Sequence, residues 1–146
     1  MSFSHYNQAR ISREITYIRM VSCLAQRSTC ARRKVGCMLV DKQGKILSMG
    51  YNGVPSGHVH CIDVPCYKIK PKSGTELDKC KAIHAEANAL MRCEDVRLIH
   101  TAYCTTMPCF ECQKLLLNTA CERIVYRDTY KQDTPIVWDG ELLNVM

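Results

Sequence analysis

Several residues able to do chemistry lie in the segment 80–90, CKAIHAEANAL, which contains Cys80, His84 and Glu86. Cys80 and His84 are four residues apart, a spacing that places two side chains on one face of a helix. Cysteine and histidine are metal ligands, and a glutamate can carry protons. The segment is therefore a candidate metal site, and its spacing alone leaves open whether it serves one metal, two metals or none.

A second set of candidate ligands lies in PCFEC, where Cys109 and Cys112 have C-x-x-C spacing. They follow a predicted strand and begin a predicted helix, where the positive end of the helix dipole stabilises thiolates. Alone, this spacing fits either a redox pair or half of a zinc site. Together with the upstream His84-Ala85-Glu86 it forms the pattern H-A-E…P-C-x-x-C, a known signature of zinc deaminases that act on cytosine or adenine.

This ligand set has a clear chemical logic. His84, Cys109 and Cys112 leave the fourth tetrahedral position of a zinc ion open for water, as a catalytic site requires, and zinc lowers the pKa of such a water to about 7. Glu86 is close enough to take the water proton, pass it to the ring nitrogen and then protonate the departing amino group, so that ammonia leaves. The alternative is a closed structural site with a fourth ligand, in which Glu86 is a solvated helix residue.

Hydrophobic periodicity predicts the helices that must position these residues. Residues 7–28 have apolar side chains at three-to-four spacing, which predicts an amphipathic helix ending near Cys30. A second helix is predicted over about 83–93, and a third from Pro108, which suits a first helical position. The glycine- and proline-rich residues 52–79 predict a long loop. The last residues, GELLNVM, predict only a stub of helix.

Apolar runs bounded by turn residues predict the strands. They fall at 35–41, 45–51, 100–106, 123–128 and, as a fifth candidate, 135–138. The first two are joined by DKQG and should form a hairpin. The later strands alternate with helices, which predicts crossover connections and a layered α/β sheet covered on both faces.

Composition limits the class of protein. No apolar run is long enough to span a bilayer, and MSFSHYNQAR lacks the apolar core of a signal peptide, so we expect a cytoplasmic protein without membrane contacts. The eleven cysteines are an odd number, which argues against a closed disulfide framework in that compartment. Metal ligation explains some of them, and Cys37 and Cys104 are expected to be core residues.

Positive charge is concentrated near the start of the chain. Residues 1–48 contain nine Lys and Arg residues but only two acidic ones, and the cluster peaks at Arg32-Arg33-Lys34. Such a cluster suits an anionic partner, either nucleic acid or a nucleotide phosphate. The alternative is a solvated face that aids solubility.

Four segments resemble the deoxycytidylate deaminases of the cytidine deaminase superfamily. They are RSTCARRKVGCMLV (27–40), GYNGVPSGHVHC (50–61), HAEANAL (84–90) and PCFEC (108–112). H-A-E and P-C-x-x-C are common to the superfamily, whereas GYNG-x-P-S-G indicates the deoxynucleotide branch. The resemblance implies a three-layer α/β/α fold with a mixed, mostly parallel central sheet. It also implies that residues 1–146 form a single zinc-dependent nucleotide deaminase domain.

The resemblance implies a role for each matching residue. His84, Cys109 and Cys112 would hold the catalytic zinc, and Glu86 would move protons. The implied substrate contacts are Asn52 to the deoxyribose 3′-hydroxyl, the Ala85 backbone to the pyrimidine carbonyl, and Arg33, Lys34, Tyr126 and Arg127 around the phosphate. The implied reaction is hydrolytic deamination of dCMP to dUMP, a precursor for dTTP synthesis, with dCTP as a further substrate if the phosphate pocket is open.

The same resemblance implies regulation and assembly. An effector site would lie at Gly50, Tyr51 and Gly53, with dCTP activating, dTTP inhibiting and Mg²⁺ accompanying the triphosphate. The assembly implied is a homo-hexamer.

Four further cysteines suggest a second metal. Cys30, Cys61, Cys66 and Cys80 lie within or beside the long loop, and some relatives carry a second zinc with ligands from these segments. We therefore predict a closed structural zinc site, with His60 as an alternative ligand to Cys66 or Cys80. Cys80 would then serve this ion, while His84 serves the catalytic one. The alternative is four unlinked core thiols.

Two other functions fit the zinc motif. The first is a deaminase that edits tRNA or single-stranded DNA, but such proteins stack bases on aromatic side chains along basic grooves. Here aromatic residues are only 7% of the chain and the basic excess is one cluster, so we expect no nucleic-acid partner. The second is a non-enzymatic zinc-binding module, which would deaminate no substrate.

Overall fold

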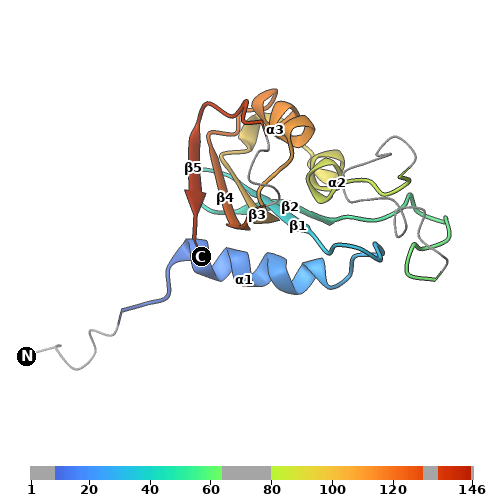
Figure 1. The fold of residues 1–146 in the computed structure, drawn as a ribbon. Coiled ribbons are helices and arrows are strands. Elements are labelled where there is room, and N and C mark those ends of the chain that lie inside the picture. Colours follow the sequence, from blue (N-terminus) through green and yellow to red (C-terminus); the bar gives the residue numbers. More distant parts are fainter. Residues whose placement is uncertain (1–8, 64–79, 130–134, 146) are drawn as a thin grey trace, which may run out of the picture.

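The computed structural model describes residues 9–63, 80–129 and 135–145 (Figure 1). The helices of this part are α1 (Arg13–Ala25), α2 (Ala85–Arg92), the short 3-10 helix η3 (Val96–Leu98) and α3 (Phe110–Leu117). The strands are β1 (Gly36–Val40), β2 (Ile46–Tyr51), β3 (Thr101–Thr106), β4 (Arg123–Asp128) and β5 (Glu141–Asn144).

The five strands form one sheet in the order β2-β1-β3-β4-β5. β1 pairs antiparallel with both β2 and β3, whereas β3, β4 and β5 are mutually parallel neighbours. Four strands therefore run in one direction and β1 alone runs in the other. This arrangement confirms the mixed, mostly parallel sheet.

Helices cover both faces of this sheet, with α1 on one side and α2 and α3 on the other (Figure 1). Strand alternation divides the core accordingly. Leu39 and Ile124 belong to the cluster on the α2 and α3 side, while Met38 and Val125 pack in the cluster of α1. The predicted three-layer α/β/α architecture is confirmed.

Helix α1 is shorter than the predicted 7–28. The Ser12 side chain caps its first turn by accepting a hydrogen bond from the Ile15 N–H at 3.2 Å, and the helix ends at Ala25. Cys30 therefore lies in the following loop and not at the helix end. At 13 residues α1 is the longest helix in the described ranges, and no helix there has the length and hydropathy needed to cross a membrane.

The C-terminal segment corrects two predictions. Residues 135–138 form no strand, because the Val137 and Trp138 N–H groups bind the Gln113 side chain and Trp138 is buried. Instead, ELLN forms β5, parallel to β4, with Leu142 and Leu143 half-buried. Pairing with β4 determined the structure of this segment, because its intrinsic helix preference is weak.

The start of the third helix also differs from the prediction. Pro108 lies before α3 and not within it, since Cys109 is the N-cap.

Candidate active site

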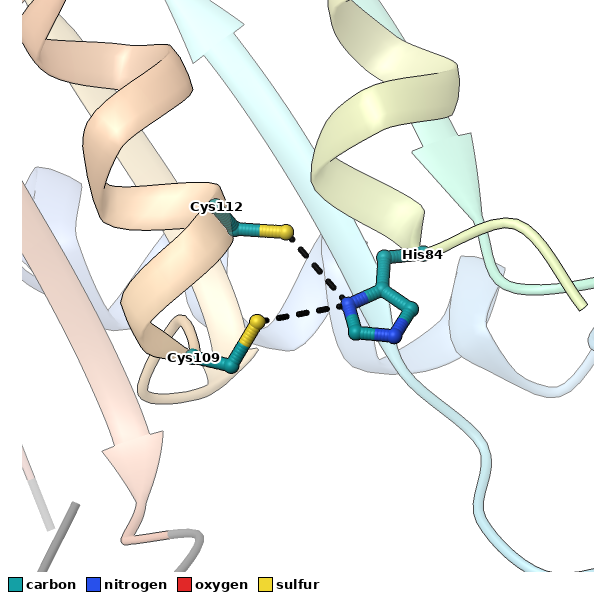
Figure 2. A group of neighbouring side chains, drawn as sticks. All are labelled: His84, Cys109 and Cys112. Carbon is teal, nitrogen blue, oxygen red and sulfur yellow. Dashed lines mark hydrogen bonds between the residues drawn. The ribbon is translucent and has the colours of Figure 1, made fainter. Parts of the chain in front are cut away.

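Two helix starts face each other on the same side of the sheet (Figure 2). His84 is the N-cap of α2, and Cys109 is the N-cap of α3 with Cys112 in its first turn. Strand β3 carries the chain to the start of α3, and the start of α2 is fixed by a backbone bridge between Gly53 and Ile83. The fold thereby brings together the three predicted zinc ligands, although Cys109 and Cys112 follow His84 by 25 and 28 positions in the sequence.

The spacing of the three ligand atoms fits zinc. The His84 Nδ1 atom lies 3.5 Å from the Cys109 Sγ and 3.4 Å from the Cys112 Sγ (Figure 2). All three atoms are within 4.8 Å of one another. Zinc–sulfur bonds of about 2.3 Å and zinc–nitrogen bonds of about 2.0 Å in a tetrahedron place sulfur and nitrogen about 3.5 Å apart. The donor set can therefore hold zinc with one position open.

Glu86 lies in the first turn of α2 and is 4% exposed. Burial raises the pKa of its carboxyl above the ordinary value, while its own backbone N–H and His84 oppose that rise. The side chain of Cys112 also opposes the rise in this pKa. A carboxyl with raised proton affinity beside a metal site is suited to moving protons.

The thiols of Cys109 and Cys112 have pKa values shifted in opposite directions. The hydrogen bond from Cys112 lowers the pKa of the Cys109 thiol, and the same hydrogen bond together with burial raises the pKa of Cys112. The N-cap position of Cys109 also places its sulfur at the positive end of α3. Cys109 is therefore the first of the pair to become a thiolate.

Asn52 is buried and holds the loop before β1. Its Oδ1 accepts from the Val35 N–H and its Nδ2 donates to the Arg33 carbonyl, both at 2.8 Å. The sequence prediction gave Asn52 a substrate contact but missed this scaffold role. Each of its polar atoms keeps capacity for one more hydrogen bond. Ala85, fully buried, follows the ligand His84 directly.

The predicted phosphate contacts separate across the sheet. Tyr126 is buried on the side of α2 and α3, but its neighbour in the strand, Arg127, points to the other face. There the Arg127 guanidinium donates to the Ser22 hydroxyl at 2.7 Å and to Asp128 at 2.9 Å. The structure therefore does not bring Arg127 to the metal ligands. Arg33 and Lys34 are exposed in the loop before β1.

Part of the predicted effector segment lines a cavity of about 580 Å³. Tyr51 and Gly53 line it, as does Ile83, the residue before His84. Gly50 lies outside it and has a packing role, because a Cβ there would come within 2.5 Å of the Ala89 nitrogen in α2. Sequence reasoning missed two cationic residues of the lining, Arg27 and Arg92; Lys34 and His60, which also line the cavity, were singled out for other roles.

Three of the four predicted ligands of a second zinc lie in the described residues. A hydrogen bond of 3.2 Å from the Ile62 N–H to the Thr29 carbonyl joins the segments that contain Cys30 and Cys61. Cys80 is half-buried, and Cys66 lies outside the described residues. Within 9–63, 80–129 and 135–145, the His84 cluster is the one group of three or more ligand-type residues close enough for a metal. The second site stays a prediction.

Comparison with known proteins agrees with this geometry. The family model described as the cytidine and deoxycytidylate deaminase zinc-binding region matches residues 11–128. The chain is 36% identical over 132 residues to the deoxycytidylate deaminase of Schizosaccharomyces pombe, covering 88% of this chain and 41% of that protein. It therefore spans about two fifths of the length of that relative. It is 37% identical to the deoxycytidylate deaminase of Mycobacterium phage D29 over 116 residues, covering 75% of this chain and 90% of that one.

Solved structures are similar over most of the chain. The dCMP deaminase from the cyanophage S-TIM5 in apo form has a TM-score of 0.71 and 27% identity, covering 93% of this chain and 99% of that chain. The structure of that deaminase in complex with dCMP and dUMP has a TM-score of 0.65 and 29% identity, covering 84% and 86%.

Proposed function

The chain belongs to the cytidine and deoxycytidylate deaminase family, and from that premise we propose that it hydrolyses dCMP to dUMP and ammonia. The observation that carries the proposal is the His84, Cys109 and Cys112 cluster, whose sulfur–nitrogen distances of 3.5 and 3.4 Å suit zinc, with the buried Glu86 beside it. The named relatives and the dCMP and dUMP complex of the cyanophage enzyme favour a deoxynucleotide substrate.

In the proposed mechanism, this chain supplies ligands and a proton carrier. Bound at His84, Cys109 and Cys112, zinc would supply a Lewis acid that lowers the pKa of a water molecule. Glu86 takes a proton from that water and delivers it to the ring nitrogen, which makes the amino-bearing carbon more electrophilic. After the remaining hydroxide attacks that carbon, Glu86 takes the second proton from the new hydroxyl group and gives it to the amino group, which leaves as ammonia. Burial of Glu86 supports both transfers, because its raised pKa lets the carboxyl hold the proton between them.

Substrate contacts are proposed for residues around this centre. Asn52, with one donor and one acceptor site left, suits the deoxyribose 3′-hydroxyl, and the Ala85 backbone suits the pyrimidine carbonyl. Arg33 and Lys34 in the exposed loop, with Tyr126, are proposed to meet the phosphate. Arg127 is left out because its guanidinium binds Ser22 and Asp128 on the face of α1.

The cavity at Tyr51 and Gly53 supports a regulatory site for dCTP and dTTP. Its described lining contains Arg27, Lys34 and Arg92 and no acidic residue, so it suits a polyphosphate, with Mg²⁺ accompanying it. The Arg92 guanidinium lies 5.9 Å from the centre of the Tyr51 ring. We propose dCTP as activator and dTTP as inhibitor at this cavity.

A structural zinc with ligands from Cys30, Cys61, Cys66 and Cys80 is a further proposal. The hydrogen bond between Ile62 and Thr29 supports it, because it holds the Cys30 and Cys61 segments side by side. We further propose that residues 1–146 form a single deaminase domain and that the protein assembles as a homo-hexamer in the cytoplasm. Its role there would be to supply dUMP for dTTP synthesis.

A panel of substrates tests this proposal directly. Ammonia release is measured with dC, dCMP, dCTP and CMP, with and without dCTP or dTTP as effector. We expect dCMP to be the best substrate, dCTP to raise its turnover and dTTP to lower it. Single-stranded DNA and tRNA complete the panel. Turnover of a polynucleotide with none of dCMP would replace the proposal with an editing deaminase, and no turnover of any substrate would leave a zinc-binding module.

A further inference from the structure

Gln113 is a fully buried polar side chain that directly follows the proposed zinc ligand Cys112 in α3. Its Nε2 donates to the Pro108 carbonyl at 2.9 Å, and its backbone N–H donates to the Cys109 carbonyl at 2.9 Å. The two carbonyls flank the N-cap of α3. Gln113 therefore holds the backbone on both sides of the Cys109 side chain.

The other end of the same amide binds a distant segment. The Gln113 Oε1 accepts from the Val137 N–H at 3.0 Å and from the Trp138 N–H at 3.1 Å, which uses both of its lone pairs. Neither these two N–H groups nor the Pro108 carbonyl belongs to a helix or strand in the structure. Leaving such groups unpaired on burial is costly, so the three bonds fix the two segments relative to each other.

We infer that Gln113 is a positioning residue for the zinc site, acting on Cys109 through the Pro108 carbonyl and coupling the Val137–Trp138 segment to the metal centre. Removing a side chain that holds a metal ligand in place commonly lowers metal affinity or activity about 10- to 100-fold. The inference rests on the proposed function only in taking the ion to be zinc. It does not depend on which substrate is deaminated.

The rate of zinc release from the metal-loaded protein to a chromophoric chelator tests this role. The phase of release that is missing in the Cys109→Ser variant identifies the catalytic site. In Gln113→Met, which keeps the side-chain length but has no amide, we expect this phase to be about tenfold faster or more. Cobalt substitution should show altered sulfur-to-cobalt absorption in the same variant, because the position of the Cys109 sulfur changes.

Trp138→Phe is the matched control. It removes the hydrogen bond from the indole N–H to the Glu141 carbonyl, 3.0 Å long, but keeps the backbone N–H group that binds Gln113. We expect a lower thermal midpoint with unchanged zinc release. If Gln113→Met is likewise less stable but releases zinc at the wild-type rate, Gln113 is a structural residue only and the inference is overturned.

A measurement on the wild-type chain decides the matter if Gln113→Met does not fold. Amide hydrogen exchange is compared between zinc-loaded and zinc-free protein. We expect loss of zinc to speed exchange at Val137 and Trp138 about tenfold or more. The Glu141 N–H, which binds the Glu122 carbonyl at 3.0 Å nearby, should change little. Equal exchange at Val137 and Trp138 in both forms would show that the segment is not coupled to the metal.

Discussion

Gly53 and Ile83 are joined by two reciprocal backbone hydrogen bonds. The Gly53 N–H donates to the Ile83 carbonyl at 3.1 Å, and the Ile83 N–H donates to the Gly53 carbonyl at 2.7 Å. Both residues line the proposed effector cavity, and Ile83 directly precedes the ligand His84. The bridge therefore connects the cavity to the metal site over a very short path, so that a shift of Gly53 should move His84.

Gly53→Ala is predicted to disturb both sites. The added Cβ would come within 2.6 Å of the Thr29 Oγ1, which accepts the Val54 N–H at 3.2 Å. Moving that hydroxyl away would cost about 1–2 kcal/mol of unfolding free energy and displace the bridge. We expect dCMP turnover to fall about tenfold, since small misplacements at a reacting centre are costly. Urea denaturation and steady-state kinetics measure the two effects.

The double variant Thr29→Ala/Gly53→Ala is the control, because it removes the hydroxyl that the new methyl group meets. Its turnover should return close to that of Thr29→Ala alone. Wild-type turnover in Gly53→Ala would mean that the bridge does not position His84.

The proposed structural zinc can be tested by counting the zinc ions bound per chain. Cys30→Ser or Cys80→Ser should lower bound zinc from two ions per chain to one, measured by elemental analysis, while the ion at His84 stays bound. Cys23→Ser is the control, because Cys23 is exposed on α1 and should bind no metal. A zinc content that does not change in either variant would mean that these cysteines are not ligands.

The buried thiol of Cys121 should make the free energy of unfolding depend on pH. Burial raises the pKa of its thiol to about 12 from an ordinary value of 9.0. Below pH 9 the thiol is neutral in both the folded and the unfolded chain, so it contributes little to the pH dependence of stability. Between pH 9 and 12 only the unfolded chain ionises, so folding stability falls as pH rises. Between pH 8 and 10, wild type should lose about 1–2 kcal/mol more than Cys121→Ala.

Urea unfolding at each pH measures this difference. Other groups that ionise in this range are present in both proteins, so their contributions cancel. Parallel pH profiles for wild type and Cys121→Ala would show that the folded chain does not keep this thiol neutral.

Local patterns in the sequence predicted most of the helices and strands and the three residues of the His84 cluster. His84 and the C-x-x-C pair both lie at helix starts, close to where periodicity and Pro108 predicted the second and third helices to begin. The limits of β4 at 123–128 also agree with the apolar run. These features depend on neighbours in sequence, which a single sequence shows directly.

Features that depend on distant neighbours were not predictable in the same way. For Arg127, strand alternation next to Tyr126 places the guanidinium against Ser22 of α1, a partner 105 residues away in the sequence. Residues 135–138 were predicted to form a strand, but the Trp138 N–H binds the side chain of Gln113 instead of a neighbouring strand. A lone glutamine in an amphipathic helix gives no signal that it will bind a segment 24 residues away.

The most direct test of the account compares dCMP deamination by wild type and Glu86→Gln, with zinc content measured on the same samples. Glutamine has nearly the size of glutamate but cannot carry the proton. The account predicts that turnover falls about 10²–10⁴-fold while the ion held by His84, Cys109 and Cys112 stays bound. Turnover within a few-fold of wild type, with zinc in place, would contradict the central claim that Glu86 moves protons at a zinc deaminase site.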